Sequence, residues 1–187
     1  MEYKKMREYT HEEFVNLILS LNEEQLLELS ARYGGYPVLF RMALDDRISH
    51  IPFIQTGSAI IIRNENGQIL LQERTDRNKW GLPGGCQELG ETFEEVVIRE
   101  VKEETNLDVR EEDLKLIKIV SGMSRRSSYP NGDVVINNTV LYLVDKYSGS
   151  LRWNSESKDM KFFDLDKLPR NQHDPDLIDT YIKYLNK

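Results

Sequence analysis

The sequence is poor in cysteine and basic residues and has no long apolar segment. A single cysteine among 187 residues excludes an internal disulfide bond. No apolar run approaches the ~20 residues that a membrane-spanning helix needs, and the first residues lack the apolar core of a signal peptide. We therefore expect a cytoplasmic protein without membrane association.

Acidic residues outnumber basic ones, with 32 Asp and Glu against 25 Lys and Arg and a formal net charge of -7. General nucleic-acid binding needs a basic surface, so this balance argues against that function. It does not exclude a single nucleotide as a small-molecule partner. A local basic loop together with a metal ion can hold phosphates on an acidic protein.

The chain is expected to have two parts. Residues 1–48 carry helical patterns and are predicted to form a small N-terminal helical extension. From about residue 49 onward the pattern changes to strands, turns and two helices, so residues 49–187 are predicted to form the main domain. Strands mixed with helices in this way indicate an α+β sandwich.

Two capping boxes predict helices in the extension. Thr10 with Glu13 starts the first helix, and Asn22 with Gln25 starts a second one that runs to about Arg32. Both helices carry apolar stripes, which need to be covered. The stripes either pack against the main domain or form a contact between two copies, so a homodimer is an open possibility.

In the main domain, the longest predicted helix begins at Thr92, which forms a capping box with Glu95. Asn106 ends it, since Asn tolerates the left-handed backbone of a helix end. A polar loop is predicted over 125–132, and a C-terminal helix over 174–185. The predicted strands lie at 59–62, 69–72, 114–120, 134–144 and 160–163.

This helix combines an apolar face with acidic residues. The apolar residues recur at the spacing of one buried face: Phe93, Val97 and Val101. At about 100° per residue, Glu100 and Glu104 fall on the same side, with Glu103 at its border. Like charges near a buried surface and near the negative end of a helix are unfavourable without a partner. A hard divalent cation is the simplest partner, and a solvated acidic face is the alternative.

The segment from Gly85 to Leu107 resembles the signature of the Nudix hydrolase family. That pattern is Gly, five residues, Glu, seven residues, Arg-Glu, an aliphatic residue, any residue, Glu-Glu, any residue, Gly, aliphatic. The matching residues are Gly85, Glu91, Arg99, Glu100, Val101, Glu103, Glu104 and Leu107. Asn106 stands at the last Gly and can adopt the same backbone conformation. The similarity extends over about residues 52–187.

The resemblance implies a Nudix α/β/α sandwich with a mixed sheet. It also implies Mg²⁺- or Mn²⁺-dependent hydrolysis of a pyrophosphate bond in a nucleoside diphosphate linked to another group. The substrate could be a nucleotide-sugar, an ADP-ribose-like molecule or a nucleoside triphosphate. A Nudix fold that acts as a nucleotide sensor or interaction module without catalysis is the alternative. Its usual mark is loss of the acidic residues of the signature, and none is lost here.

The same resemblance assigns roles within the signature. Glu100, Glu103 and Glu104 would hold the metal, and Glu103 and Glu104 would take part in catalysis, with Glu103 as a ligand or a base. Gly84 and Gly85 would let the backbone approach the site, where the Gly85 carbonyl could touch the metal and Gly84 the substrate.

Two further signature residues are expected to act through structure. Arg99 is expected to pair with Glu91 or Glu95 and so to hold the loop against the helix, without which the catalytic site would be disordered. Cys86 is expected to be a small filler, because the signature accepts any residue there.

Outside the signature, an acid from a loop commonly completes such sites. Glu156 is the candidate with a catalytic role and Asp159 is the second candidate, although loops carry acids routinely.

The candidates for binding the substrate are Arg125, Arg126 and Tyr129. The two arginines could clamp phosphates, and Tyr129 could stack on a base. We expect the arginine loop to be exposed, so that little of the core depends on it. The alternative is a solvated turn.

Overall fold

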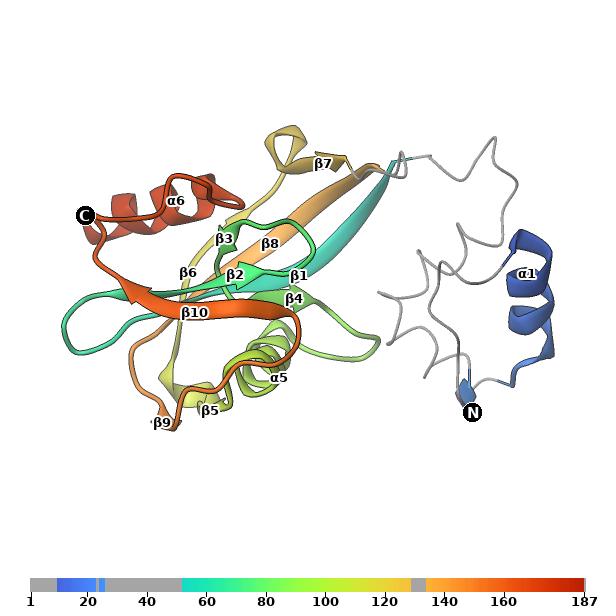
Figure 1. The fold of residues 1–187 in the computed structure, drawn as a ribbon, viewed down its shortest axis with the longest axis horizontal. Helices are drawn as coiled ribbons and strands as arrows, with labels where there is room; N and C mark the ends of the chain where they lie inside the picture. Colours follow the sequence, from blue (N-terminus) through green and yellow to red (C-terminus); the bar gives the residue numbers. More distant parts are fainter. Residues whose placement is uncertain (1–9, 23, 26–51, 129–133, 187) are drawn as a thin grey trace. The chain divides into compact units, whose positions relative to one another are not determined.

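The computed structural model describes residues 10–22, 24–25, 52–128 and 134–186 (Figure 1). The chain divides into two compact units, which are residues 1–54 with 126–136 and residues 55–125 with 137–187. In the described part of the chain, no helix has the length and apolarity to cross a membrane.

Helix α1 (His11–Ser20) begins with the predicted capping box. The backbone N–H of Thr10 donates to Glu13 Oε2 at 2.8 Å, and the N–H of Glu13 donates to Thr10 Oγ1 at 3.2 Å. Asn22 and Gln25 exchange the same pair of hydrogen bonds at 3.1 and 2.9 Å. The second helix start is therefore confirmed, and the helix predicted beyond Gln25 lies outside the described residues.

The largest sheet has the strand order β4-β1-β8-β6, and β7 also pairs with β8. Its strands are β1 (Phe53–Ile62), β4 (Gly84–Cys86), β6 (Leu114–Val120), β7 (Arg126–Ser128) and β8 (Val134–Val144). Strands β1 and β8 run side by side in the same direction (Figure 1). The pairs β1–β4, β6–β8 and β7–β8 are antiparallel. The sheet is therefore mixed, as predicted.

A second sheet has the order β10-β2-β3, and two short strands, β5 and β9, form a separate pair. The bounds are β2 (Ile69–Arg74), β3 (Trp80–Gly81), β5 (Leu107–Asp108), β9 (Ser148–Gly149) and β10 (Ser157–Phe163). The helices of this part are α5 (Phe93–Thr105) and α6 (Pro175–Leu185), with 3₁₀ turns η2 (Glu111–Asp113) and η3 (Met123–Arg125). The predicted polar loop over 125–132 is wrong at its start, because η3 and β7 lie there.

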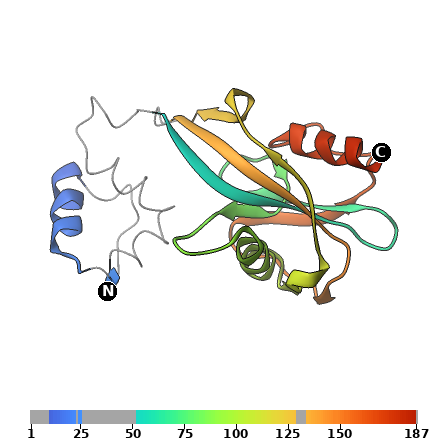
Figure 2. The same cartoon turned by 180° about the vertical axis from the view of Figure 1, so that it is seen from behind.

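Successive side chains of β1 point to opposite faces, and each face packs on a different helix. Ile60 and Ile62 belong to the core cluster that contains Val97 of α5. Ala59 and Ile61 belong to the cluster that contains residues of α6. Figure 1 and Figure 2 show α5 and α6 on opposite sides of the strands. The predicted α/β/α sandwich is therefore confirmed.

Both ends of α5 form as the sequence predicts. The backbone N–H of Thr92 donates to Glu95 Oε2 at 2.7 Å, and the N–H of Glu95 donates to Thr92 Oγ1 at 3.2 Å. Asn106 has φ 61° and ψ 11°, which is left-handed, and its Nδ2 donates to the Ser150 carbonyl at 3.0 Å. The acidic residues of the signature therefore stand on one helix with fixed ends.

The left-handed backbone of Asn106 gives a stability prediction. Asn106→Val should lower the free energy of unfolding by about 1 kcal/mol or more, because a β-branched residue is strained in this conformation. Asn106→Gly should retain wild-type activity, since glycine adopts the same backbone freely and residue 106 is not one of the acids. Urea unfolding of both variants measures the difference. Equal stability of the Val variant and the wild type would show that residue 106 does not control the helix end.

Candidate active site

The loop before α5 brings backbone directly against an acidic side chain. A Cβ atom at Gly85 would overlap Oε1 of Glu100, so this position has no room for a side chain unless Glu100 moves. Gly84 has φ +144°, and a Cβ there would overlap the carbonyl oxygen of Ser58. Position 84 therefore requires glycine, whereas a side chain at position 85 would displace Glu100.

Glu104 is the most deeply buried of the three acids, with 3% of its surface exposed. Its Oε2 accepts a hydrogen bond from the backbone N–H of Gly84 at 2.8 Å, and its Oε1 accepts one from Gln72 Nε2 at 2.9 Å. Burial raises the pKa of Glu104 to about 8, and the charge of Glu100 adds to this effect. A positive charge at its free lone pairs would relieve the penalty.

Glu100 and Glu103 differ in exposure as the helical wheel predicts. The side chain of Glu100 is 12% exposed and that of Glu103 is 57% exposed. Burial raises the pKa of Glu100, against the opposing effect of Arg99, which donates to its Oε1 at 2.7 Å. Two acids therefore face the interior and the third lies at the border.

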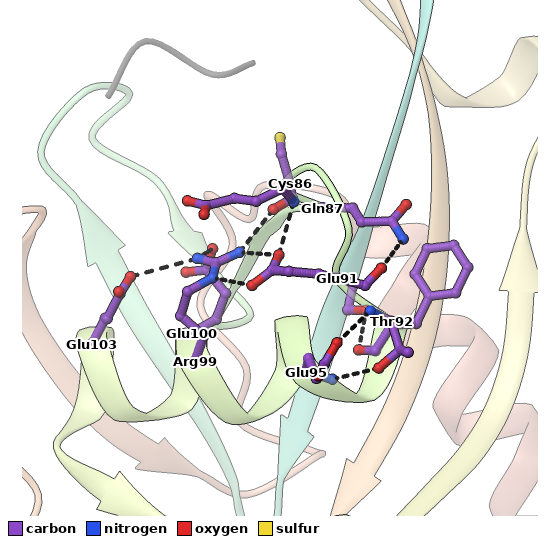
Figure 3. Close-up of polar contacts among 11 residues, drawn as sticks. Cys86, Gln87, Glu91, Thr92, Glu95, Arg99, Glu100 and Glu103 are labelled. Atoms are coloured by element: carbon purple, nitrogen blue, oxygen red, sulfur yellow. Dashed lines mark hydrogen bonds and ion pairs between the residues drawn. The ribbon is translucent and has the colours of Figure 1, made fainter. Parts of the chain in front are cut away.

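Arg99 ties the helix to the glycine loop (Figure 3). Its Nε and Nη2 donate to the two carboxylate oxygens of Glu91 at 2.6 and 2.9 Å, and Nη2 also donates to the Cys86 carbonyl at 3.0 Å. The hydrogen bond from Arg99 lowers the pKa of Glu91. Of the two partners considered, Glu91 is the one paired, because Glu95 is used in the capping box.

The Cys86 thiol is poorly suited to be a nucleophile. Burial raises its pKa to about 11, and the negative charge of Glu100 adds to this effect. A thiol with this pKa stays protonated near neutral pH, whereas the thiolate is the reactive form. The residue therefore has the properties of the small filler that the sequence suggests.

The carboxylates of Glu100, Glu103 and Glu104 are suitable ligands for a hard cation, but their side chains do not converge on one point. Among the described residues, no three His, Cys, Asp or Glu side chains form a group that could hold a metal ion. The reason is local, because Glu100 bonds to Arg99 and Glu103 lies 3.5 Å from Arg99 Nη1. Carboxylate oxygens are nevertheless the ligands that Mg²⁺ and Mn²⁺ accept. Each of these contacts uses one oxygen of the carboxylate, so Glu100 Oε2 and Glu103 Oε1 are not engaged by Arg99 in these contacts.

The loop that carries Glu156 is hydrogen-bonded to α5 and to the residue that follows β2. Asn154 Nδ2 donates to the Glu103 carbonyl at 3.1 Å, and the Glu156 carbonyl accepts from the N–H of Thr75 at 2.9 Å. Burial is the main cause of the raised pKa of Glu100, and the charge of Glu156 contributes to it. Glu156 therefore lies within electrostatic range of the acids, whereas Asp159 forms an ion pair with Lys161.

The structure contradicts the expectation that little of the core depends on Arg125. This residue is 5% exposed, and its Nη1 donates to both carboxylate oxygens of Asp176 at 2.9 and 3.0 Å. Its Nη2 lies 3.3 Å from Asp174 Oδ2. Arg125 therefore fastens η3 to the start of α6. Arg126 is exposed on β7, and Tyr129 lies outside the described residues.

Arg125→Ala should lower the free energy of unfolding by about 1–3 kcal/mol, because it leaves two acids without their partner. The estimate is below that for a fully buried pair, since Asp174 and Asp176 are partly exposed. Arg126→Ala is the matched control and should stay within ~0.5 kcal/mol of the wild type. Urea unfolding measures both. Equal stability of the two variants would show that the buried ion pairs do not stabilise the fold.

Sequence analysis missed three residues beside the acids: Gln72, Arg74 and Ser157. A signal existed for Gln72, because strand residues two apart share a face and Leu70 packs toward α5. A polar residue at the next position on that face is 1% exposed and reaches Glu104. Arg74 lies close enough for its charge to act on Glu104, although burial dominates the pKa of that acid.

Comparison with known proteins agrees with this geometry. Residues 54–184 match the family model described as NUDIX domain. The ADP-ribose pyrophosphatase of Methanocaldococcus jannaschii is 33% identical over 130 residues, covering 67% of this chain and 72% of that protein. The NAD-capped RNA hydrolase NudC of Vibrio atlanticus is also 33% identical, over 67% of this chain but only 43% of that protein.

A solved structure supports the same assignment. The crystal structure of a MutT NUDIX hydrolase from Burkholderia pseudomallei superposes with a TM-score of 0.57 and 26% identity. The similarity covers 69% of this chain and 97% of that one. The family match spans the two sheets, the signature helix and α6. The chain therefore belongs to the Nudix hydrolase family, and it is a pyrophosphohydrolase.

Proposed function

We propose that the chain uses Mg²⁺ or Mn²⁺ to hydrolyse a pyrophosphate bond in a nucleoside diphosphate linked to another group. The observation that carries this proposal is the pair of acids Glu100 and Glu104, one turn apart in the C-terminal half of α5, of which Glu104 is buried and Glu100 is 12% exposed. Burial raises the pKa of each. A bound dication would offset the cost of burying these negative charges, and it would place a Lewis acid at the same site.

In this proposal Glu100, Glu103 and Glu104 hold the metal, with the Gly85 carbonyl beside them. The metal supplies polarisation of a phosphate oxygen and a lowered pKa of a bound water. Glu103 is the most exposed of the three, so its carboxylate is suited to accept a proton from water. Glu156 is the second candidate for this proton transfer. Arg99 acts by positioning, because its contacts are with acids and the loop carbonyl.

The substrate candidates follow from the relatives and from the charges near the acids. The named activity of the archaeal relative makes an ADP-ribose-like molecule the first candidate, followed by nucleotide-sugars and nucleoside triphosphates. Arg125, Arg126, Tyr129 and Gly84 remain proposed substrate contacts. Arg74, which also donates to Asp76, is added to them as a proposed phosphate contact, because its charge acts on Glu104 and Glu156.

A substrate panel tests the function. The wild type should release AMP and ribose 5-phosphate from ADP-ribose when Mg²⁺ or Mn²⁺ is present, and excess chelator should abolish turnover. The panel should include a nucleotide-sugar, nucleoside triphosphates and NAD-capped RNA, since one relative is named for the last of these. Chromatography of the products identifies the bond that is cleaved. Tight nucleotide binding without turnover of any member would favour the sensor alternative.

We further propose that residues 1–48 are an accessory extension to a hydrolase domain of residues 49–187. The family match begins at residue 54, which supports a boundary near this point. Phe14 of α1 is only 1% exposed, whereas Leu17, Ile18 and Leu21 of the same apolar stripe are partly exposed. A homodimer in which these faces contribute to the contact is part of the same proposal.

A further inference from the structure

A chain of buried polar side chains leads from the second sheet to Glu104. Ser157 Oγ donates to Gln72 Oε1 at 2.5 Å, and Gln72 Nε2 donates to Glu104 Oε1 at 2.9 Å. The three residues are 6%, 1% and 3% exposed. A buried polar side chain is costly unless it is hydrogen-bonded. These three residues meet that condition at buried positions where apolar residues are more usual.

The ionised form of Glu104, which is the form that binds a cation, fixes the direction of these hydrogen bonds. An ionised carboxylate only accepts, so in this form the amide of Gln72 turns its nitrogen toward Glu104. Its carbonyl oxygen then faces Ser157, and the hydroxyl must donate. The carboxylate therefore sets the amide orientation, and the hydrogen bond from Ser157 holds the amide in that orientation. The N–H of Gly84 holds the other carboxylate oxygen at 2.8 Å, so both oxygens are fixed.

Gln72 and Ser157 lie on neighbouring strands of the second sheet. Gln72 lies in the middle strand of the second sheet, paired with Gly81 on one side and Met160 on the other. Ser157 stands at the start of β10, where a register shift separates it from Asp159. Ser157 directly follows Glu156 and belongs to the loop that Asn154 fastens to the carbonyl of Glu103. The loop therefore contacts the signature helix at its backbone and, through Gln72, at Glu104.

We propose that Gln72 and Ser157 are positioning residues that hold the carboxylate of Glu104 in the orientation in which it binds the metal. The inference rests on the proposed metal role of Glu104 and adds the residues that orient it. Both lie outside the family signature, in β2 and β10. The hydrogen bond from Gln72 occupies one lone pair of Glu104 Oε1, and that from Gly84 occupies one of Oε2, so a further lone pair on each oxygen is available for a cation.

Gln72→Met tests the central link, because methionine has a similar length but neither donates nor accepts in the same way. Mn²⁺ affinity, measured by electron paramagnetic resonance without nucleotide, should fall about 10- to 100-fold. With the best substrate and saturating metal, kcat should fall while KM stays within about threefold, because Gln72 is 1% exposed and so offers the nucleotide almost no surface. A general loss of fold would instead lower the fraction of active protein and leave the Mn²⁺ affinity of the remainder unchanged.

Ser157→Ala tests the outer link with a smaller change, since it removes one hydroxyl. It should lower Mn²⁺ affinity in the same direction by about threefold to tenfold, because the Gln72 amide is then free to turn. The double variant should bind Mn²⁺ no more weakly than Gln72→Met alone, since both residues act through one path. Independent, additive losses would overturn the proposal that Ser157 acts through Gln72.

Gln68→Met is the matched control. Gln68 also donates from its amide to a carboxylate, Asp164, but it lies in the turn before β2, and Asp164 follows the end of β10. The Mn²⁺ affinity of the Gln68→Met variant should equal that of the wild type. If the wild type binds no Mn²⁺, the proposed metal function fails and this inference fails with it. If the wild type binds Mn²⁺ and Gln72→Met binds it equally well, the metal function stands and the positioning role of Gln72 is overturned.

Discussion

Glu104→Gln is expected to lower kcat by about a thousandfold or more while the protein stays folded. The carboxylate is buried and proposed as a direct metal ligand, and the amide keeps its size but loses the charge. Initial rates at saturating Mg²⁺ with the best substrate of the panel measure the loss. Glu112→Gln is the control, since that acid is 66% exposed and pairs with Arg110 outside the signature. A Glu104 variant with wild-type activity would remove this residue from the metal site.

The same variant should change how stability depends on pH in metal-free protein. Burial raises the folded-state pKa of Glu104 from 4.5 to about 8, so the native state binds more protons than the unfolded state between these values. The contribution of protonated Glu104 to the stability of the fold is therefore fully present below pH 4.5 and is lost as the pH rises through about 8. The melting temperature of the wild type should fall over this range, and that of Glu104→Gln should fall less.

Metal binding should reverse this loss. Mn²⁺ added near pH 8 should raise the melting temperature of the wild type, because a ligand that binds only the native state stabilises it. Glu104→Gln should show a much smaller rise. Identical pH dependence in both proteins, with equal responses to Mn²⁺, would mean that the buried charge of Glu104 does not destabilise the metal-free fold.

The signature helix could be predicted from sequence because its determinants are local. The capping residues are three positions apart, and the apolar stripe repeats within one helix. The left-handed conformation of Asn106 likewise depends on the residue itself and the chain around it. Helical geometry then places Glu100 and Glu104 on the buried side before any tertiary contact is known.

Other features depend on partners that the local pattern does not contain. Arg125 was expected in an exposed loop, but its acidic partner Asp176 is 51 positions away in α6. Strands β3 and β5 have two residues each, which is too short to show an alternating pattern. The link from Ser157 to Gln72 spans 85 positions and requires the pairing of β10 with β2. Such contacts follow from the topology of the sheets and not from neighbouring residues.

Gly85→Ala should reduce activity by about a hundredfold or more with little loss of stability. The new methyl group would overlap the carboxylate of Glu100, which is the end of a flexible side chain and can move aside. The backbone of Gly85 is not in the left-handed region, so alanine is not strained there. The expected change in unfolding free energy is therefore within ~1 kcal/mol, while a proposed metal ligand is displaced. Activity assays and urea unfolding measure the two effects separately.

Gly84→Ala provides the contrast, because its methyl group would meet the backbone carbonyl of Ser58 and its φ is +144°. Neither obstacle can move aside, so this variant should lose stability as well as activity. A double-mutant cycle then tests the mechanism proposed for Gly85. In a Glu100→Gln background, adding Gly85→Ala should cause little further loss of activity, because the displaced ligand has already lost its charge. A second hundredfold loss in that background would show that Gly85 acts through its own backbone and not by making room for Glu100.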